Sequence, residues 1–355
     1  AVVRDTLGSN TTGADNTALG KSALYGNTTG NFNVAVGARS LDANTTGSGN
    51  TAVGEDSLSA ATTANDNTAV GQNALKANTS GANNTAVGQG SLDANTTGGS
   101  NTAVGTVALS ACTTAANNTG VGYAALSANT TGSGQNSAFG AYALEETTTG
   151  ELNTAVVFEA LEKNTSASGN TAVGWNALNS NTTGDRNVAI GTTSLGSNTV
   201  LDRNVAVGYQ ALKTMNDATN NDTYNIAIGY SAGFSVTTGG FNTIMGGLAL
   251  DASTTADSCT AVGYLAGTAV TTGGNNTLIG RSAGAAITTG TNNLCLGRAT
   301  GDNTTTGSNN VSIGYQSQPS AATDSQSITV GYALTGKGTN TGFYGGNTAV
   351  YSETN

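Results

Sequence analysis

A pentapeptide, Asn-Thr-Ala-Val-Gly, returns along this chain at a nearly constant interval and constrains the fold more than any other feature. It stands at 50–54, 67–71, 84–88 and 101–105, with looser copies from 16–20 to 327–331. Its fourth residue recurs every 17 residues at every step but two, which are 18 from Val121 to Phe139 and 21 from Val207 to Ile228. A fixed period of this length is typical of repeat architectures, in which each unit stacks on the next.

The same residue types return at the same places in each repeat, numbered here from the fourth residue of the pentapeptide as position 0. Position −3 is Asn in nearly every repeat, −1 is usually Ala, +1 is Gly except at Val157, and +5 is Leu through the first two thirds of the chain. A short β-prone run followed by Gly predicts a strand and a turn, and we expect a second short strand through the Ala-Leu segment. The sequence therefore predicts an all-β parallel solenoid of about 19 coils.

Alternation along the predicted strand assigns each position to one of two faces. We expect Val at position 0 and the residue at −2 to fill the coil interior, and Ala at −1 to face outward. Stacking at about 4.8 Å would place the Asn side chains above one another in a hydrogen-bonded ladder, although Asn is also a common turn residue. The structural columns of the central repeats are Asn50, Val53, Gly54, Asn67, Val70, Gly71, Asn84, Val87 and Gly88.

The predicted outward Ala column bears on the oligomeric state, because a monomer would leave it bare. Small residues in register allow close backbone approach, so we expect other copies of the chain to cover this face. This favours a parallel homo-oligomer. We expect a homotrimeric rod, while the spacing alone also leaves a dimer open.

The repeat changes along the chain, and four segments follow from the changes. Residues 1–215 carry Leu at position +5, 216–224 hold an inserted polar loop, 225–331 carry Gly at +5 with β-branched residues at +8, and 332–355 form a closing segment without the repeat. We interpret the two repeat segments as parts of one rod.

The composition argues against several classes of function. A formal net charge of −10, with 11 basic residues scattered singly, argues against binding to nucleic acid or to an anionic membrane. The chain has no His, which removes Ser-His-Asp and Cys-His nucleophile systems and most zinc sites. Carboxylates fall at predicted solvated corners, and no Gly-rich corner has the Lys-Ser/Thr of a phosphate loop. We predict no catalytic residue, no metal and no cofactor.

Three cysteines, Cys112, Cys259 and Cys295, are odd in number and far apart. We interpret them as small residues tolerated in repeat columns, and not as a disulfide or metal site. Unpaired thiols favour assembly in a reducing compartment. The sequence lacks an apolar run long enough to span a membrane, and the missing initiator Met leads us to expect a chain trimmed from a longer precursor.

Aromatic residues at the corners are the best candidates for contact with a receptor such as a host-surface glycan, although packing between coils or subunits also explains them. The candidates are Tyr25, Tyr142, Trp175, Tyr209 and Tyr230. Asn-Thr-Thr and Asn-Thr-Ser triplets also fit the glycosylation acceptor pattern, which follows here from the composition of the corner. They begin at Asn10, Asn27, Asn44, Asn78, Asn95, Asn129, Asn164, Asn181 and Asn303.

The repeat, Asn-Thr-Ala-Val-Gly with Ala-Leu and Asn-Thr-Thr-Gly, resembles the head repeats of trimeric autotransporter adhesins, which form a left-handed β-roll. It resembles more closely the repeat shafts of bacteriophage tail fibres whose precursors end in an endosialidase-type intramolecular chaperone. The resemblance covers about residues 1–331, and the closing Gly342-Phe343-Tyr344-Gly345-Gly346 is similar to the segment before such a chaperone. It implies a trimeric fibre on a virion tail that meets other tail proteins.

The first functional hypothesis is therefore a structural fibre for host-cell attachment, located on the extracellular face of a virion tail. The alternative is a bacterial surface adhesin or a secreted extracellular filament subunit. A polysaccharide-degrading enzyme and an ice-binding solenoid are weaker alternatives, because the carboxylates form no evident pair and the Thr columns are interrupted at Asn216.

Overall fold

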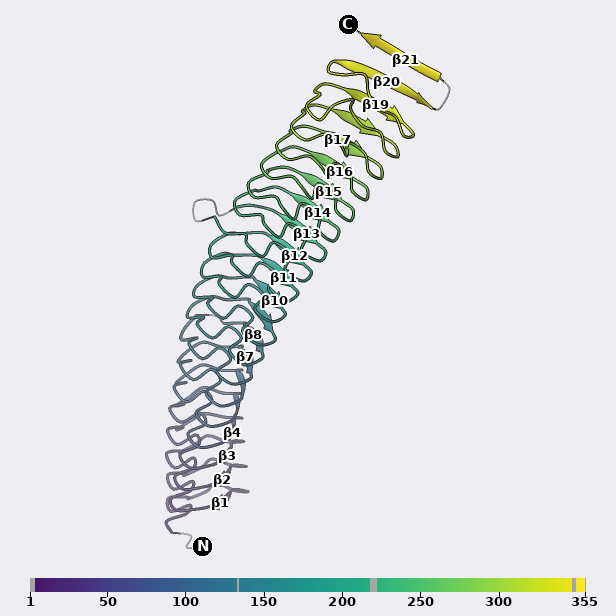
Figure 1. The fold of residues 1–355 in the computed structure, drawn as a ribbon. Coiled ribbons are helices and arrows are strands. Elements are labelled where there is room, and N and C mark those ends of the chain that lie inside the picture. The colour runs from purple at the N-terminus through teal and green to yellow at the C-terminus, as the bar shows by residue number, and fades with distance from the viewer. Residues whose placement is uncertain (1–3, 133, 218–221, 347–348, 355) are drawn as a thin grey trace. The chain divides into compact units, whose positions relative to one another are not determined.

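The computed structural model of the chain describes residues 4–132, 134–217, 222–346 and 349–354. The chain divides into two compact units, Ala1–Trp175 and Asn176–Asn355. Each unit is a parallel β-solenoid in which one short strand per coil stacks on the strand of the next coil, and no helix occurs within the described ranges (Figure 1). The all-β solenoid and its 17-residue repeat are thus confirmed.

The strands coincide with positions −2 to 0 of the predicted repeat. The first unit contains β1 (Thr17–Leu19), β2 (Val34–Val36), β3 (Thr51–Val53), β4 (Thr68–Val70), β5 (Thr85–Val87), β6 (Thr102–Val104), β7 (Thr119–Val121), β8 (Ser137–Phe139), β9 (Thr154–Val156) and β10 (Thr171–Val173). The second contains β11 (Val188–Ile190), β12 (Val205–Val207), β13 (Ile226–Ile228), β14 (Thr243–Met245), β15 (Thr260–Val262), β16 (Thr277–Ile279), β17 (Leu294–Leu296), β18 (Val311–Ile313), β19 (Ile328–Gly331), β20 (Thr341–Gly346) and β21 (Ala349–Thr354).

Successive strands pair in register, so that position 0 of one coil lies beside position 0 of the next. Val53 pairs with Val70 between β3 and β4, and Val262 pairs with Ile279 between β15 and β16. The closing segment continues the second unit's sheet, because β20 pairs in parallel with β19 and then with β21 in antiparallel. Each residue type therefore forms a column along its unit.

The prediction of which strand face is interior was wrong. Ala52, at position −1, has no exposed surface, whereas Thr51 and Val53 on either side of it are only half-buried. The same alternation recurs in β2, β4 and β6. The Leu at +5 takes up much of the interior: a Cβ at Gly120, position −1 of β7, would already lie 3.4 Å from Leu109 of the preceding coil, so a small residue suits position −1 there. Val therefore faces outward, with its apolar surface on the outside of the sheet.

The second strand predicted through the Ala-Leu segment is also absent, because that segment forms turns. Leu58 and Leu75, at position +5, have left-handed backbones with φ of 52° and 51° and fully buried side chains. A non-Gly residue in this region costs about 1–2 kcal/mol. Burying a Leu side chain contributes about 1.5–3 kcal/mol, which offsets that strain.

Gly at position +1 is required by geometry. Gly54 has φ of +137°, and a Cβ there would lie 2.5 Å from the carbonyl oxygen of Gly71 in the next coil. The positive φ and the close approach of the next coil both require Gly here, and both agree with its predicted role in turning the chain after the strand.

In four coils of the second unit Gly replaces Leu at +5, at Gly233, Gly267, Gly284 and Gly301, and neighbouring positions fill the space. The predicted change over 225–331 is not uniform, because Leu250 keeps the +5 position. Gly267 keeps the left-handed φ, +62°, and a Cβ there would lie 2.6 Å from Leu278 Cδ1. Leu278 occupies position −1, where most coils have Ala, and the buried Val270 at +8 adds further apolar volume. The predicted exchange of one apolar core site for another therefore takes place, and position −1 shares in it.

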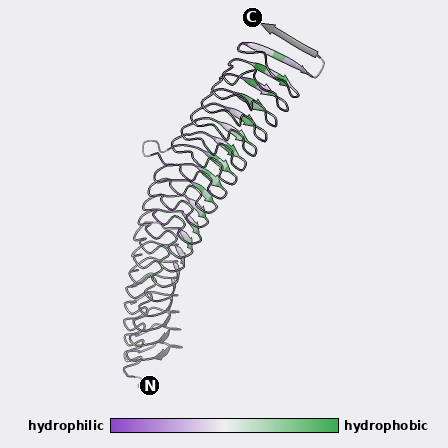
Figure 2. Ribbon diagram, in the orientation of Figure 1, coloured by the Kyte–Doolittle hydropathy of each residue, from purple (hydrophilic) through white to green (hydrophobic). Residues whose placement is uncertain are grey.

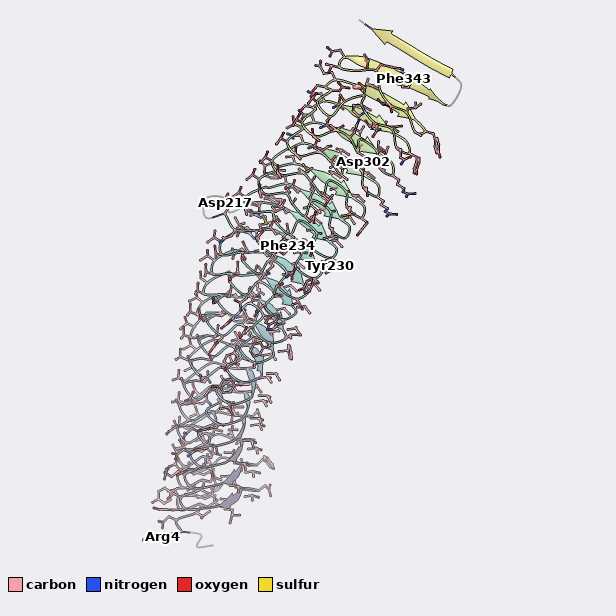
Figure 3. The ribbon with its side chains drawn as sticks, viewed as in Figure 1. Arg4, Asp217, Tyr230, Phe234, Asp302 and Phe343 are labelled. Atoms are coloured by element: carbon pink, nitrogen blue, oxygen red, sulfur yellow. The ribbon has the colours of Figure 1, made fainter. Side chains whose placement is uncertain are left out.

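The inserted loop leaves the strand register intact. The predicted segment 216–224 lies partly outside the described residues, which omit 218–221. Asn216 accepts a side-chain hydrogen bond from Thr199 Oγ1 at 2.7 Å, and Val205 still pairs with Ile226 across the insertion. Figure 3 shows Asp217 on the side of the second unit away from its strands.

Two columns of Asn side chains run through the coil interior. At position −3, Asn67 Nδ2 donates to Asn50 Oδ1 at 3.1 Å and to the carbonyl oxygen of Gly81 at 2.9 Å. At position +8, Asn44 Nδ2 donates to Asn27 Oδ1 at 2.8 Å. The second column was not predicted, because the Asn of Asn-Thr-Thr-Gly was placed at a solvated corner.

The second Asn column removes most of the glycosylation acceptors. Asn27, Asn44, Asn78, Asn95, Asn129, Asn164 and Asn181 have no exposed surface. A side-chain amide held inside a coil cannot carry a glycan, so these triplets reflect the requirements of the turn.

Candidate binding surface at position +2

The corner that follows each strand carries the most varied exposed side chains of the repeat. Position +2 comes directly after the obligatory Gly, where the chain leaves the sheet. In the second unit this position holds Thr192, Tyr209, Tyr230, Gly247, Tyr264, Arg281, Arg298, Tyr315 and Tyr332. Because the strands are in register, these residues form one column, called here the corner column.

Backbone hydrogen bonds tie the corner column together. Ser282 N donates to the Tyr264 carbonyl at 2.9 Å, Ala299 N to that of Arg281 at 2.9 Å, and Gln316 N to that of Arg298 at 3.0 Å. Ala333 N donates to the Tyr315 carbonyl at 2.7 Å. Side chains one coil apart are therefore held about one strand spacing apart, roughly 4.8 Å.

Two of the predicted receptor-contact residues lie in the corner column and stack on each other. The rings of Tyr209 and Tyr230 have centroids 5.4 Å apart and planes at 11°. Tyr230 remains 59% exposed, and Figure 3 shows it near the strand side of the second unit. The two rings therefore pack neighbouring coils together, and they also leave an aromatic surface accessible to solvent.

The other predicted aromatics lie in the first unit and pack differently. Tyr142 lies between Tyr123 and Phe158 with edge-to-face ring contacts of 5.3 and 5.7 Å, and it is half-buried. The ring of Tyr25 covers Gly8 of the preceding coil, although Tyr25 is 48% exposed. Trp175 is also exposed. Tyr142 thus serves mainly to pack neighbouring coils.

Two arginines in the corner column were missed by the sequence reasoning. Arg281 and Arg298 occupy adjacent coils and are exposed. Within the described residues neither guanidinium forms an ion pair with a carboxylate, whereas Arg39 is paired with Glu55 and Asp56. The signal that could have found them is their position, since both follow the Gly of the pentapeptide by one residue.

Beside the arginines lies an aromatic pair. The Arg298 guanidinium carbon lies 5.5 Å from the ring centroid of Tyr315, a cation–π distance. Tyr315 in turn stacks on Tyr332, with centroids 5.2 Å apart and planes at 22°. Tyr332 is the most exposed of these rings, at 63%.

A small polar hollow adjoins the same coils. Its volume is about 230 Å³, and it is lined by Ala299, Asp302, Gln316, Gln318, Ala333 and Thr335. Three of these residues directly follow Arg298, Tyr315 and Tyr332 in sequence. Burial raises the pKa of the Asp302 carboxyl.

The described residues contain no group of three or more Cys, Asp or Glu side chains that could hold a metal ion. The three cysteines are free and buried, and burial raises the pKa of Cys112 to about 11 and of Cys295 to about 12. Over the described ranges, no helix has the length and apolar character that a membrane span requires.

Comparison with known proteins adds no relative. Scans of protein-family models, curated proteins and solved structures each returned no significant match. The fold and site define a class, a parallel β-solenoid with an exposed aromatic and cationic corner.

Proposed function

We propose that this chain is the subunit of a homotrimeric structural fibre that attaches to host cells, of the phage tail-fibre type. The outer face of the strands carries the proposal. Val87, Ile190 and Met245, at position 0, are 36, 40 and 42% exposed. Their columns run in register along each unit, and Figure 2 shows mainly apolar strands in the second unit.

An apolar face of this kind favours association with copies of the same chain. Contiguous exposed apolar patches mark interaction surfaces, and a surface that repeats every coil is matched best by another surface with the same repeat. The Ala column, through which we expected the copies to associate, is buried inside the coils and cannot form the interface. The proposal now rests on the outward Val, Ile and Thr columns instead.

The oligomeric state provides the first test. Sedimentation equilibrium should give a mass of three chains of 34.7 kDa each. Val87→Asp places a charge on the outer face and should shift the mass toward that of one chain while the far-ultraviolet circular dichroism spectrum is kept. Gln89→Asp, at the exposed +2 corner of the same coil, is the matched control and should remain trimeric. A single-chain mass for the unaltered protein would refute the proposal.

Location provides the second test. A gold-labelled antibody against this chain should mark the tails of intact virus particles in electron micrographs. Labelling of a bacterial surface or of a secreted filament would replace the tail fibre with the adhesin alternative.

A further inference from the structure

We propose that the corner of the second unit around β16–β19 binds an acidic saccharide, a pyranose unit that carries a carboxylate. The proposed site consists of Arg281, Arg298, Tyr315 and Tyr332 with the adjoining hollow. It rests on the proposed function only in that a fibre must expose this corner to a host surface, and all of its groups belong to one chain.

The cationic part of the site comes from Arg281 and Arg298. The backbones of these two exposed arginines lie on adjacent coils, about one strand spacing apart, so their charges repel each other. The described residues hold no carboxylate within ion-pair distance of either guanidinium. A carboxylate placed between them relieves this repulsion and accepts charge-assisted hydrogen bonds from both. Arg is suited to this task because its planar donors match the two carboxylate oxygens.

The aromatic part lies one coil further along. Arg298 lies over the Tyr315 ring and Tyr332 stacks on the same ring, so the exposed ring of Tyr332 is the open aromatic surface of this pair. The C–H face of a pyranose ring is apolar and packs on aromatic faces of this kind, as apolar ligand surface does in most pockets. A sugar whose carboxylate meets the arginines would thus place its ring, or the next ring, over the tyrosines.

The hollow supplies hydrogen-bond partners for hydroxyl groups. Asp302, Gln316, Gln318 and Thr335 present acceptors and donors around about 230 Å³. This is below the volume of drug-sized pockets, about 300–1,000 Å³, and fits one sugar ring. The raised pKa of Asp302 agrees with a carboxyl that is partly withdrawn from water.

The charges exclude a polyanion such as nucleic acid as the ligand. Neutralising several phosphates requires several Lys or Arg side chains, and this corner has two. The Asp302 carboxylate in the hollow, together with the net charge of −10, would repel a dense row of phosphates. A sugar with one carboxylate matches the charges of this corner, because its carboxylate can face the two arginines while its hydroxyl groups face Asp302.

The experiment is titration calorimetry on the full chain with two acidic probes, sialyllactose and oligogalacturonate. Their neutral counterparts are the methyl esters of the two saccharides, which differ from them only in the carboxylate charge, so the two arms distinguish a sialic acid from a uronic acid. We expect one acidic probe to bind at least about 10-fold more tightly than its neutral counterpart, because losing a charge-assisted hydrogen bond of about 1.4 kcal/mol changes affinity by that factor.

Variants locate the binding. Arg281→Gln with Arg298→Gln should weaken it at least about 10-fold, and Tyr332→Ala should weaken the acidic and the neutral probe alike. Lys21→Gln is the matched control, since Lys21 occupies position +2 in the first coil, and it should bind as the unaltered chain does. Failure of both acidic probes to bind, equal binding of acidic and neutral probes, or full binding by the double Arg variant would each overturn the inference.

The result is separable from that of the proposed function. A trimeric mass without saccharide binding would overturn only this inference. A single-chain mass with binding lost in the double Arg variant would overturn only the proposed fibre.

Discussion

The side chain of Asn67 donates from Nδ2 to Oδ1 of Asn50 at 3.1 Å, and Asn84 Nδ2 donates to Asn67 Oδ1 in the same sense at 3.2 Å. Each amide in this column thus links two neighbouring coils. Both partners are buried, so no water can replace a lost bond.

Removing one member of this ladder should destabilise the first unit. Asn67→Ala leaves the buried backbone N–H of Asn84 without its partner, and it removes one of the two donors to the Gly81 carbonyl, which keeps its hydrogen bond from Asn78 Nδ2. We expect a cost of about 1–3 kcal/mol for the orphaned N–H, seen as a lower urea midpoint by circular dichroism. Gln89→Ala, at an exposed corner, is the control and should leave the midpoint within error. An unchanged midpoint for Asn67→Ala would show that the ladder contributes nothing.

Completing the second ladder should stabilise the same unit. Asn44 Oδ1 is buried without a hydrogen-bond partner, and the next residue of its column is Ala61. Ala61→Asn supplies the missing donor. It should be combined with Ala64→Gly, because a Cβ at Gly47, the equivalent position one coil earlier, would lie 2.4 Å from Asn44 Oδ1.

We expect the double variant to unfold at a higher urea concentration than its control. The gained hydrogen bond should raise the free energy of unfolding by about 1 kcal/mol. Ala64→Gly alone is its control and should lower the midpoint slightly, because Gly loses more conformational freedom on folding. A double variant no more stable than that control would contradict the account of the orphaned oxygen.

The core is filled by Leu at +5 in most coils, whereas around Gly267 it is filled by Leu278 at −1 and Val270 at +8. Exchanging one arrangement for the other should succeed only when all three positions change together. Gly267→Leu alone forces a side chain into space held by Leu278 and Val270, and overpacking costs about 1–3 kcal/mol. Adding Leu278→Ala and Val270→Asn recreates the core of the first unit and should recover most of that loss. Thermal unfolding of the single, double and triple variants measures the coupling, and additive effects would show that these positions do not share one space.

The pair formed by Arg39 and Asp56 should make stability depend on pH at the acid end. Arg39 Nε lies 2.5 Å and Nη2 2.8 Å from the two carboxylate oxygens of Asp56, and the hydrogen bond from Arg39 lowers the pKa of Asp56. The unfolded chain titrates near pH 4, so the pair's contribution is present above about pH 4 and is lost as pH falls through the lower folded-state pKa.

Urea midpoints of the unaltered chain and of Asp56→Asn should therefore differ at pH 7 and converge near pH 2. Since Asp56 is the partner closest to Arg39, Glu55→Gln should have a smaller effect at pH 7. A constant difference between the unaltered chain and Asp56→Asn at both pH values would assign the effect to packing instead of charge.

The buried thiols should resist alkylation until the chain unfolds. Burial raises the pKa of Cys112 to about 11 and that of Cys295 to about 12, so little thiolate exists at pH 8. Iodoacetamide followed by mass spectrometry should leave both unmodified in buffer and modify both in urea. Thr12→Cys, at an exposed position near the start of the described residues, supplies a positive control for the reagent.

Much of the fold could be predicted from the sequence because the period dominates it. The strands β1 to β19 begin at the predicted position −2, since an Asn at −3 and a Gly at +1 flank positions −2 to 0 in nearly all of these coils. The faces could not be assigned by alternation alone. Alternation sorts Ala52 and Val53 onto opposite sides, but the interior side is the one on which Ala52 is buried together with Leu58, and alternation does not reveal that the large interior side chain comes from the turn.

The candidate site was only half predictable. Tyr209 and Tyr230 were found as corner aromatics, whereas Arg281 and Arg298 were set aside as isolated charges. Arginines 17 residues apart are distant in sequence and adjacent in a solenoid. Asp302 and Gln318 could not be found at all, because the hollow depends on how the last coils turn.

In the central repeats of the first unit, the side-chain amides of the Asn column each donate to the Asn Oδ1 of the coil made before their own. A ribosome releases the earlier coil first, so its free Oδ1 is already in place when the next Asn emerges. Every finished coil thus serves as a template for its successor, and the chain can fold vectorially during synthesis, one coil at a time.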